Sequence, residues 1–467
     1  PDREVPPKLW EVKKVYQYIG FAPDDLLAGR LKIRNRYYDT NLDRFYPTWS
    51  LLENGVELQR GELPPISLAP GAETTLTVPF KLPVPRPGAE YWVRVDFHLN
   101  QDTLWAAKGH VVAWEQYQIP VATPARPTLD LAGLPPVKVQ DSGDRLILSG
   151  PRFSATFDRK AGALTSLVYD GRTISAPTTG ALTGPVFDAY RAPTNNDVGL
   201  TGAWSRAGLS KLSRRVEAFE VDSSDPRVVR VHLRSFSTGA PNTGFVHDCL
   251  YTVLGNGTIH VDNAITPQGA LPTLPRLGVR MALVPGFESL EWYGRGPHEN
   301  YVDRKRSAEV GRYRSTVTEQ YVRYPWPQET GNREDVRWLT LTDKSGGGVL
   351  VVADKNAATG LVGERQRTHA QARDDPMPGL CPVRSRQWQL RSGRAGQVRP
   401  ASASLPVWFP PAALLAHRRR SADSRRSRSA SCRCASDQPR RGRSCRPHRT
   451  RRRCGPLHAR RHRADVA

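Results

Sequence analysis

The sequence predicts an all-β protein, in which an immunoglobulin-like sandwich precedes a larger antiparallel sandwich. Three observations favour this fold class. Short segments of alternating apolar and polar residues recur along the chain, helical periodicity is scarce, and a proline-rich passage at 120–139 divides the strand-rich region in two. A period of two is typical of strands with one buried face, and many short strands with few helices are typical of sandwiches.

Two short helices are expected first, at 9–16 and 201–212. The clearest strand is 91–99, whose alternation predicts a half-buried strand. Asn256-Gly257 lies between two apolar triplets, and this pair accepts the positive φ angles of a tight hairpin turn. Further strands are predicted at 153–157, 229–233, 279–284 and 350–353.

The proline-rich passage sets the predicted domain boundaries. Proline removes a backbone donor and disfavours both helix and inner strand, so 120–139 is interpreted as a linker. Residues 17–119 have the length of an immunoglobulin-like sandwich, roughly 100 residues. Residues 140–362 are too many for a second such unit and favour a large sandwich.

Positive charge is concentrated in the C-terminal part. Residues 366–467 hold 25 Arg and 5 Asp but no Lys or Glu, so they carry +20 of the net charge of +23. Their bias towards Arg, Ala, Ser, Pro and Gly is typical of GC-rich coding DNA translated in the wrong frame. We therefore expect 363–467 to be a frameshifted or otherwise non-native tail that is disordered.

Nucleic-acid binding is the alternative for this tail, because Arg neutralises phosphate. Nucleic-acid binders usually mix Lys with Arg and add aromatic residues, whereas the tail has only Trp388, Trp408 and Phe409. Its cysteines lack the paired spacing of a zinc site. The prediction is therefore no nucleic-acid partner and no metal.

The remaining body has one cysteine, Cys249, which suits a reducing compartment. No apolar run approaches the ~20 residues of a membrane span, and no signal peptide is visible. Cytoplasmic localisation without a membrane partner is predicted. The first residue is Pro1, so the natural start is expected to be missing.

Three segments combine aromatic, amide and charged residues, namely 190–199, 292–304 and 324–333. Aromatic faces stack on the C–H face of a sugar, while amides and carboxylates bind its hydroxyl groups. Carboxyl and imidazole groups such as those of His298, Glu299 and Asp303 can also act as acid or base. The candidate carbohydrate-binding residues are Trp292, His298, Glu299, Asn300, Trp326 and Glu329.

A structural interpretation of the same segments stays open. Buried charged groups need partners, so arginines and aspartates of these segments can pair with one another or with backbone. The residues assigned to the motifs themselves are Arg191, Asn196, Asp197, Gly294, Gly296, Asp303 and Arg304. Gly294-x-Gly296 lacks the third glycine of a dinucleotide-binding fingerprint, so it does not indicate NAD.

The three segments resemble motifs of the large bacterial β-galactosidases of glycoside hydrolase family 2. Residues 292–304 (WYGRGPHENYVDR) are similar to that family's W-[YF]-G-x-G-P-x-E-N-Y-x-D-R motif, and 191–199 (RAPTNNDVG) to its R-A-P-x-x-N-D-x-G motif. Residues 324–332 resemble its Y-x-x-P-x-E-x-G segment. The resemblance implies that 1–16 is the end of a catalytic barrel and that 140–362 is a galactose mutarotase-like sandwich.

This resemblance implies hydrolysis of terminal non-reducing β-D-galactose residues, as in lactose, with retention. The family's two catalytic glutamates lie on barrel strands that this sequence does not contain, so no catalytic residue is assigned. Its magnesium and sodium ligands are not visible either, so no cofactor is predicted. Trp388 does not lie in the family's pattern for a substrate-binding tryptophan.

We therefore expect a truncated C-terminal fragment of a β-galactosidase that is inactive alone, and whether it counts as an enzyme is left open. The expected partners are a β-galactoside or galactose, and either a barrel-bearing chain or further copies of the parent enzyme. Two alternatives remain. The chain is the small subunit of a two-chain β-galactosidase, or it is a free-standing carbohydrate-binding or mutarotase-like sandwich.

Overall fold

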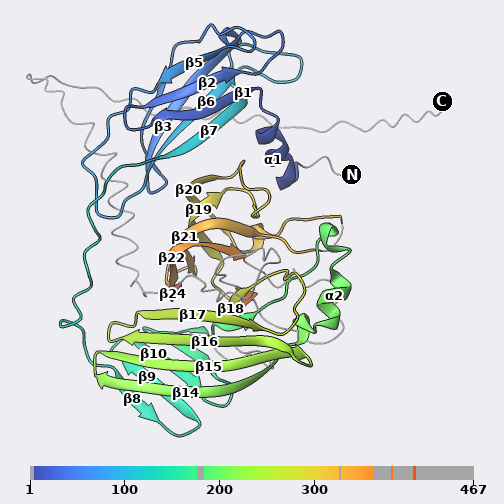
Figure 1. Ribbon diagram of the computed structural model, residues 1–467. Coiled ribbons are helices and arrows are strands. Elements are labelled where there is room, and N and C mark those ends of the chain that lie inside the picture. Colours follow the sequence, from blue (N-terminus) through green and yellow to red (C-terminus); the bar gives the residue numbers. More distant parts are fainter. Residues whose placement is uncertain (1–4, 176–183, 326–327, 361–379, 382–402, 406–467) are drawn as a thin grey trace, which may run out of the picture. The chain divides into compact units, whose positions relative to one another are not determined.

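The structure, a computed structural model, describes residues 5–175, 184–325, 328–360, 380–381 and 403–405 (Figure 1). In these ranges antiparallel strands predominate, and the α-helices are α1 (Pro7–Val15) and α2 (Thr201–Arg206). The all-β prediction is confirmed. The predicted tail at 363–467, with Trp388, lies outside the described residues except for two short strands, β23 (Leu380–Cys381) and β24 (Ala403–Leu405).

Two sheets form the region before the proline-rich passage. One has the order β1-β2-β5 and the other β4-β3-β6-β7, and all of their pairings are antiparallel. Their inward side chains form one hydrophobic core, which includes Leu31, Ile33, Leu51, Val93, Val95 and Phe97. The strands are β1 (Ile19–Asp25), β2 (Arg30–Asn35), β3 (Phe45–Glu53), β4 (Val56–Glu62), β5 (Glu73–Thr77), β6 (Tyr91–Leu99) and β7 (Val111–Ile119).

Strand β6 has the bounds that its alternation predicted, but it is not half-buried. Trp92 and Asp96, which alternate with the core residues, are also buried. Because β6 lies between β3 and β7, its backbone is covered on both sides. Trp92 is covered in addition by Tyr293 and Val310, which come from a distant part of the sequence.

The region after the proline-rich passage contains a five-stranded sheet of order β12-β11-β10-β9-β8 and a nine-stranded sheet of order β14-β15-β16-β17-β24-β22-β21-β19-β20. The first comprises β8 (Lys138–Asp141), β9 (Arg145–Gly150), β10 (Phe153–Asp158), β11 (Ala163–Tyr169) and β12 (Arg172–Ser175). The second comprises β14 (Ser213–Asp225), β15 (Val228–Ala240), β16 (Thr243–Leu254), β17 (Ile259–Gln268), β19 (Ser289–Gly296), β20 (Glu309–Thr316), β21 (Asn332–Thr342), β22 (Gly348–Gly360) and β24.

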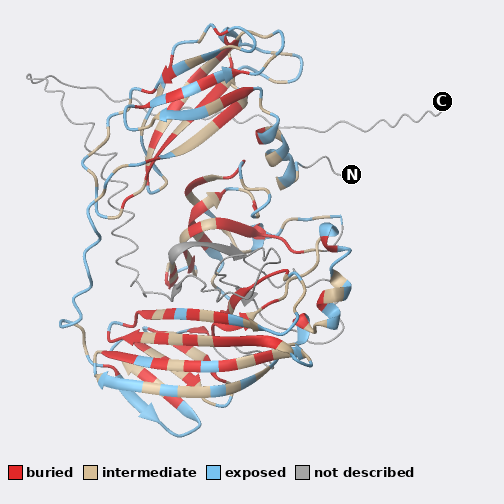
Figure 2. Ribbon diagram, in the orientation of Figure 1, coloured by how far each residue is buried: buried red, intermediate tan, exposed pale blue. Residues whose placement is uncertain are grey.

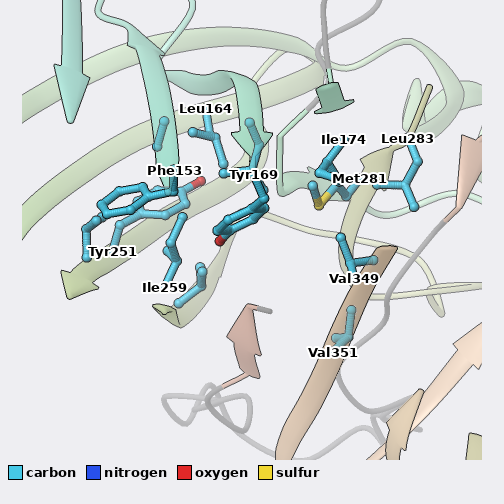
Figure 3. Packing of buried hydrophobic residues seen from close by; sticks show 14 of the residues in the cluster. Phe153, Leu164, Tyr169, Ile174, Tyr251, Ile259, Met281, Leu283, Val349 and Val351 are labelled. Atoms are coloured by element: carbon cyan, nitrogen blue, oxygen red, sulfur yellow. The ribbon is translucent and has the colours of Figure 1, made fainter. Parts of the chain in front are cut away.

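The inner faces of these two sheets share a hydrophobic core (Figure 3). Burial alternates along β10 and through most of β15, as the sequence predicted, and Figure 2 shows bands of buried residues along β15 to β17. A third small sheet of order β13-β18-β23 adds β13 (Val186–Asp188) and β18 (Gly278–Ala282). Its Met281 also belongs to the shared core.

The predicted Asn-Gly hairpin joins β16 to β17. Gly257 has φ of 87°, which residues other than glycine rarely adopt, and the hydroxyl of Tyr169 donates to its carbonyl over 2.6 Å. The turn is therefore fixed both by its own backbone and by the opposite sheet. The helix expected at 201–212 is shorter than predicted, because a 3-10 turn at Leu209–Lys211 follows α2 after Gly208, whose φ is 64°.

The edge strand β20 contacts the β4-β3-β6-β7 sheet. The side-chain amide of Gln116 on β7 donates to the carbonyl of Val310 and accepts from its backbone N–H, both over 2.8 Å. Arg94 on β6 forms an ion pair of 2.8 Å with Glu309 on β20. These contacts satisfy part of the edge that the nine-stranded sheet would otherwise expose.

Candidate functional site

The 292–304 segment begins on β19 and continues into the loop before β20. The two motif glycines allow the neighbouring strands β20 and β21 to approach β19 closely. A Cβ on Gly294 would lie 2.8 Å from the backbone Cα of Val336, and one on Gly296 would lie 2.7 Å from the ring of Tyr313. Since real Cβ atoms essentially never come this close, both positions require glycine.

Glu299 lies at the centre of the loop and is 1% exposed. Its Oε1 accepts from Arg304 Nη2 over 2.5 Å and from the hydroxyl of Tyr324, and its Oε2 accepts from the backbone N–H of Gly331 over 2.7 Å. We call Glu299, Arg304, Tyr324 and Gly331 the Glu299 cluster. It connects the 292–304 segment to the 324–333 segment, so the structure brings two of the three predicted segments together.

Asn300 connects the same region through hydrogen bonds to backbone groups. Its side-chain carbonyl accepts from the N–H of Glu334 over 2.8 Å, while its own N–H donates to the carbonyl of Asn332 over 2.9 Å. The side-chain N–H of Asn332 donates to the backbone carbonyl of Asn300 over 2.7 Å. Asn300 and Asn332 are fully buried, so their polar groups serve the protein interior.

His298 faces α1 rather than the Glu299 cluster. Its ring stacks on that of Trp10, with centroids 6.2 Å apart, and its Nε2 lies 2.9 Å from the hydroxyl of Ser307. Burial, with the nearby guanidinium groups of Arg333 and Arg304, lowers the pKa of His298 to about 4. The ring is therefore neutral at pH 7 and is a weak proton donor there.

Trp292 is 2% exposed, and its indole N–H donates to the carbonyl of Arg295 over 3.0 Å. The buried guanidinium of Arg333 lies over its ring, 5.1 Å from the centroid. Burial lowers the pKa of Arg333 to about 10. The face of Trp292 that a sugar would need is thus in contact with protein.

Glu329 belongs to a second buried group of charges. Arg276 donates to its Oε1 and, over 3.1 Å, to Asp188 Oδ2. Arg276 and Glu329 are both buried, at 6% and 8% exposure. Trp326, the neighbouring candidate, lies outside the described residues, so its predicted role stays a prediction.

The 190–199 segment forms a turn around Asp197. Its carboxylate accepts from Arg191 over 2.6 and 3.2 Å, and from the backbone N–H and hydroxyl of Thr194 over 2.6 and 2.8 Å. This is a capping box on a 3-10 turn, closed by an ion pair. Asn196 and Asp303 are exposed, and neither joins the Glu299 cluster.

The 292–304 and 324–333 segments therefore bind each other, and the charged groups of the 190–199 segment pair within that segment. Glu299 and Glu329 each bind an arginine, and within the described ranges no group of three His, Cys, Asp or Glu is placed to hold a metal. No described helix is long and apolar enough to cross a membrane. The carbohydrate-binding assignments stay predictions.

Sequence reasoning missed the residues that complete these groups. Arg276 lies 53 residues from Glu329 and belongs to none of the three segments. Glu309 lies just beyond the 292–304 segment, and its partner Arg94 comes from the other sandwich. Arg276 and Glu309 lie in none of the three segments and in none of the predicted strands, so the sequence held no signal for them.

Two family models match the chain. One is described as "Beta galactosidase small chain" and matches residues 149–375; the other is described as "Beta-galactosidase, domain 4" and matches residues 31–120. The chain belongs to the β-galactosidase family, as a C-terminal part. The resemblance that the three motif segments indicated is thereby confirmed.

Curated β-galactosidases agree with this assignment. The chain is 31% identical to those of Priestia megaterium and Vibrio cholerae and 28% identical to that of Psychromonas ingrahamii, over 73–75% of its length. It spans about one third of the length of these relatives. A solved structure of a proposed mutarotase from Salmonella typhimurium covers 59% of this chain and 96% of its own, at 15% identity and a TM-score of 0.34.

Proposed function

We propose that this chain is a non-catalytic C-terminal part of a β-galactosidase, and that it supports chemistry performed on a separate catalytic part. The assembled enzyme would hydrolyse terminal non-reducing β-D-galactose residues of β-galactosides with retention. The observation that carries the proposal is the state of the two motif glutamates. Glu299 and Glu329 are buried and bound to Arg304 and Arg276.

A retaining glycosidase needs one carboxylate as nucleophile and one carboxyl group as acid, about 5–5.5 Å apart on either side of the scissile bond. Both must reach the substrate. Glu299 and Glu329 instead accept hydrogen bonds inside the protein, and removing either from its arginine would leave a buried charge unpaired. The relatives' additional two thirds of polypeptide is the natural source of the catalytic pair.

A second arrangement is a two-chain enzyme, in which this chain is a separate small subunit. The match to the small-chain family over residues 149–375 favours it. In that arrangement the catalytic part is a second polypeptide, whereas in the first it precedes this region in the same polypeptide. Both arrangements give the chain the same supporting role.

The test is turnover of a chromogenic β-galactoside by the purified chain, alone and after co-expression with the coding sequence directly upstream of it. We expect no turnover by the chain alone above a mock preparation, and turnover when the upstream polypeptide is present. Turnover by the chain alone would overturn the proposal. So would the lack of any upstream or separate polypeptide that restores activity.

A further inference from the structure

The inner face of the nine-stranded sheet carries buried polar residues between two apolar clusters. On β16, Phe245 belongs to a cluster around Trp204, whereas Cys249 belongs to the core shared with the five-stranded sheet. His247 lies between Phe245 and Cys249 on the same face of the strand and is 0% exposed. The polar residues at this level, one from each of the neighbouring strands β14 to β17, are Arg214, Ser235, His247 and Asn263, which we call the polar belt.

Antiparallel pairing brings the members of the polar belt next to one another. Ser235 on β15 is directly opposite His247 on β16, so their Cβ atoms are about 4.5–5.5 Å apart. Arg214 on β14 is opposite Ser237, which makes it a diagonal neighbour of Ser235 and puts Ser235 within reach of its long side chain. The Nη2 of Arg214 donates to the carbonyl of Gly162, in the turn between β10 and β11, so this side chain crosses the interior of the sandwich.

Four polar atoms of the belt are buried and have no hydrogen-bond partner among the described residues. They are Nε and Nη1 of Arg214, Oγ of Ser235 and Nδ1 of His247. The whole side chains of Ser235 and His247 are buried as well, at 0% exposure. Buried polar atoms are nearly always hydrogen-bonded, either to protein or to ordered water. Four such atoms on three adjacent strands therefore indicate a molecule bound between them.

The hydrogen-bonding groups of the belt define the chemistry of that molecule. Nε2 of His247 lies 2.9 Å from Oδ1 of Asn263, an oxygen that can only accept, so Nε2 carries the proton. Burial lowers the pKa of His247 to about 4, and the charge of Arg214 acts in the same direction, so at pH 7 the ring is neutral and its Nδ1 is an acceptor. The Arg214 nitrogens can only donate, and the Ser235 hydroxyl can do either. An anion would accept from Arg214 but would lie against the lone pair of Nδ1, whereas water can accept and donate at the same oxygen.

We propose that the polar belt binds a buried water molecule, which accepts from the Arg214 guanidinium and donates to Nδ1 of His247, with the Ser235 hydroxyl as its third partner. Buried waters typically make about three hydrogen bonds, to polar groups that would otherwise be unsatisfied. This water links β14, β15 and β16 through their side chains, in addition to their backbone pairing. It brings no counter-charge, so the cost of burying the charge of Arg214 remains. The inference concerns the interior of the large sandwich and does not depend on the proposed function.

The test counts the long-lived internal waters of the full chain by oxygen-17 relaxation dispersion of the solvent. Ser235→Val removes the hydroxyl and adds a methyl group where the water binds, so the count should fall by about one. Ser235→Ala removes the hydroxyl without adding bulk, so the water should stay between Arg214 and His247. Thr252→Val is the matched control, because it exchanges a hydroxyl for a methyl group on the outer face of β16. This control should leave the count unchanged.

Equal counts in wild type and Ser235→Val would overturn the proposal, and His247→Phe repeats the count should Ser235→Val not fold. Nitrogen-15 NMR of the histidine-labelled chain is the second measurement, with the His247 signals assigned by their loss in His247→Phe. Nδ1 of His247 should show the shift of a nitrogen that accepts a hydrogen bond, and the shift of a nitrogen without one would contradict the proposal. Bromide that binds to wild type but not to Arg214→Gln would assign the belt to an anion, which also overturns it.

Discussion

Arg304 reaches back five residues to Glu299, and its Nη2 donates to Oε1 of that carboxylate over 2.5 Å. The Tyr324 hydroxyl and the Gly331 N–H complete the shell around the same side chain. The Glu299 carboxylate thus connects two loops inside the protein.

Glu299→Gln should lower the free energy of unfolding by about 3 kcal/mol, because it leaves Arg304 without a counter-charge in a buried site. Urea unfolding followed by tryptophan fluorescence measures this. Asp303→Asn, in the same loop but exposed, is the control and should change stability by no more than about 0.5 kcal/mol. Equal effects of the two variants would contradict a structural role for Glu299.

Asp197→Asn should cost about 2 kcal/mol or more, since the amide cannot replace a carboxylate that accepts from both Arg191 and Thr194. The neighbouring Asn196→Ala should be nearly neutral, because Asn196 is exposed. Thermal unfolding of the two variants gives the comparison. A larger loss in the Asn196 variant would show that the turn is held differently.

Gly294→Ala should destabilise the protein by about 2 kcal/mol, because the new methyl group would press on the backbone of β21 at Val336. Gly199→Ala is the matched control, since a Cβ at that position meets nothing within 4 Å. Chemical unfolding of both variants under the same conditions decides between them. Indifference to alanine at Gly294 would mean that β19 and β21 are not packed as described.

Arg214→Met should stabilise the protein by about 1 kcal/mol. The guanidinium donates to the carbonyl of Gly162, but its Nε and Nη1 have no partner among the described residues, and burial lowers its pKa. Replacing this half-buried charge, for which no carboxylate partner is found among the described residues, by an apolar side chain of similar length removes its desolvation cost. Arg215→Met, on the outer face and paired with Glu217, should be neutral. A lower melting temperature for Arg214→Met than for wild type would refute the argument.

Glu309→Gln should change how stability depends on pH. Burial raises the pKa of Glu309 to about 7, above the usual 4.5, although Arg94 and Lys14 act the other way. Between about pH 4.5 and 7 the folded state holds a proton that the unfolded state has released, so stability falls as pH rises through this window. The variant lacks that loss, so its stability relative to wild type should increase by about 3 kcal/mol from pH 4.5 to pH 7 and stay constant above.

The comparison must be made as a difference between variant and wild type. Burial lowers the pKa values of His247 and His298 to about 4. The stability that these two neutral side chains contribute is therefore lost as pH falls from 6.5 towards 4, which is opposite to the effect of Glu309. Their contribution is the same in both proteins and cancels. A difference that does not vary between pH 4.5 and 7 would show that Glu309 titrates normally.

Strands whose burial follows their own period, such as β10 and most of β15, and the turn at Asn256-Gly257 could be predicted from local sequence patterns. These patterns also located the groups that pair over a few residues, as Arg191 does with Asp197. Alternation and short spacing are local properties, so they depend only on residues that are close in sequence and can be predicted from them.

The pairing of distant charges and the covering of sheet faces could not be predicted in this way, because both depend on how the chain folds. Arg276 meets Glu329 across 53 residues, and Glu309 meets Arg94 between two sandwiches. The order of strands in the nine-stranded sheet follows from how complete sheets pack. That packing depends on the summed burial of many side chains and not on any one local pattern.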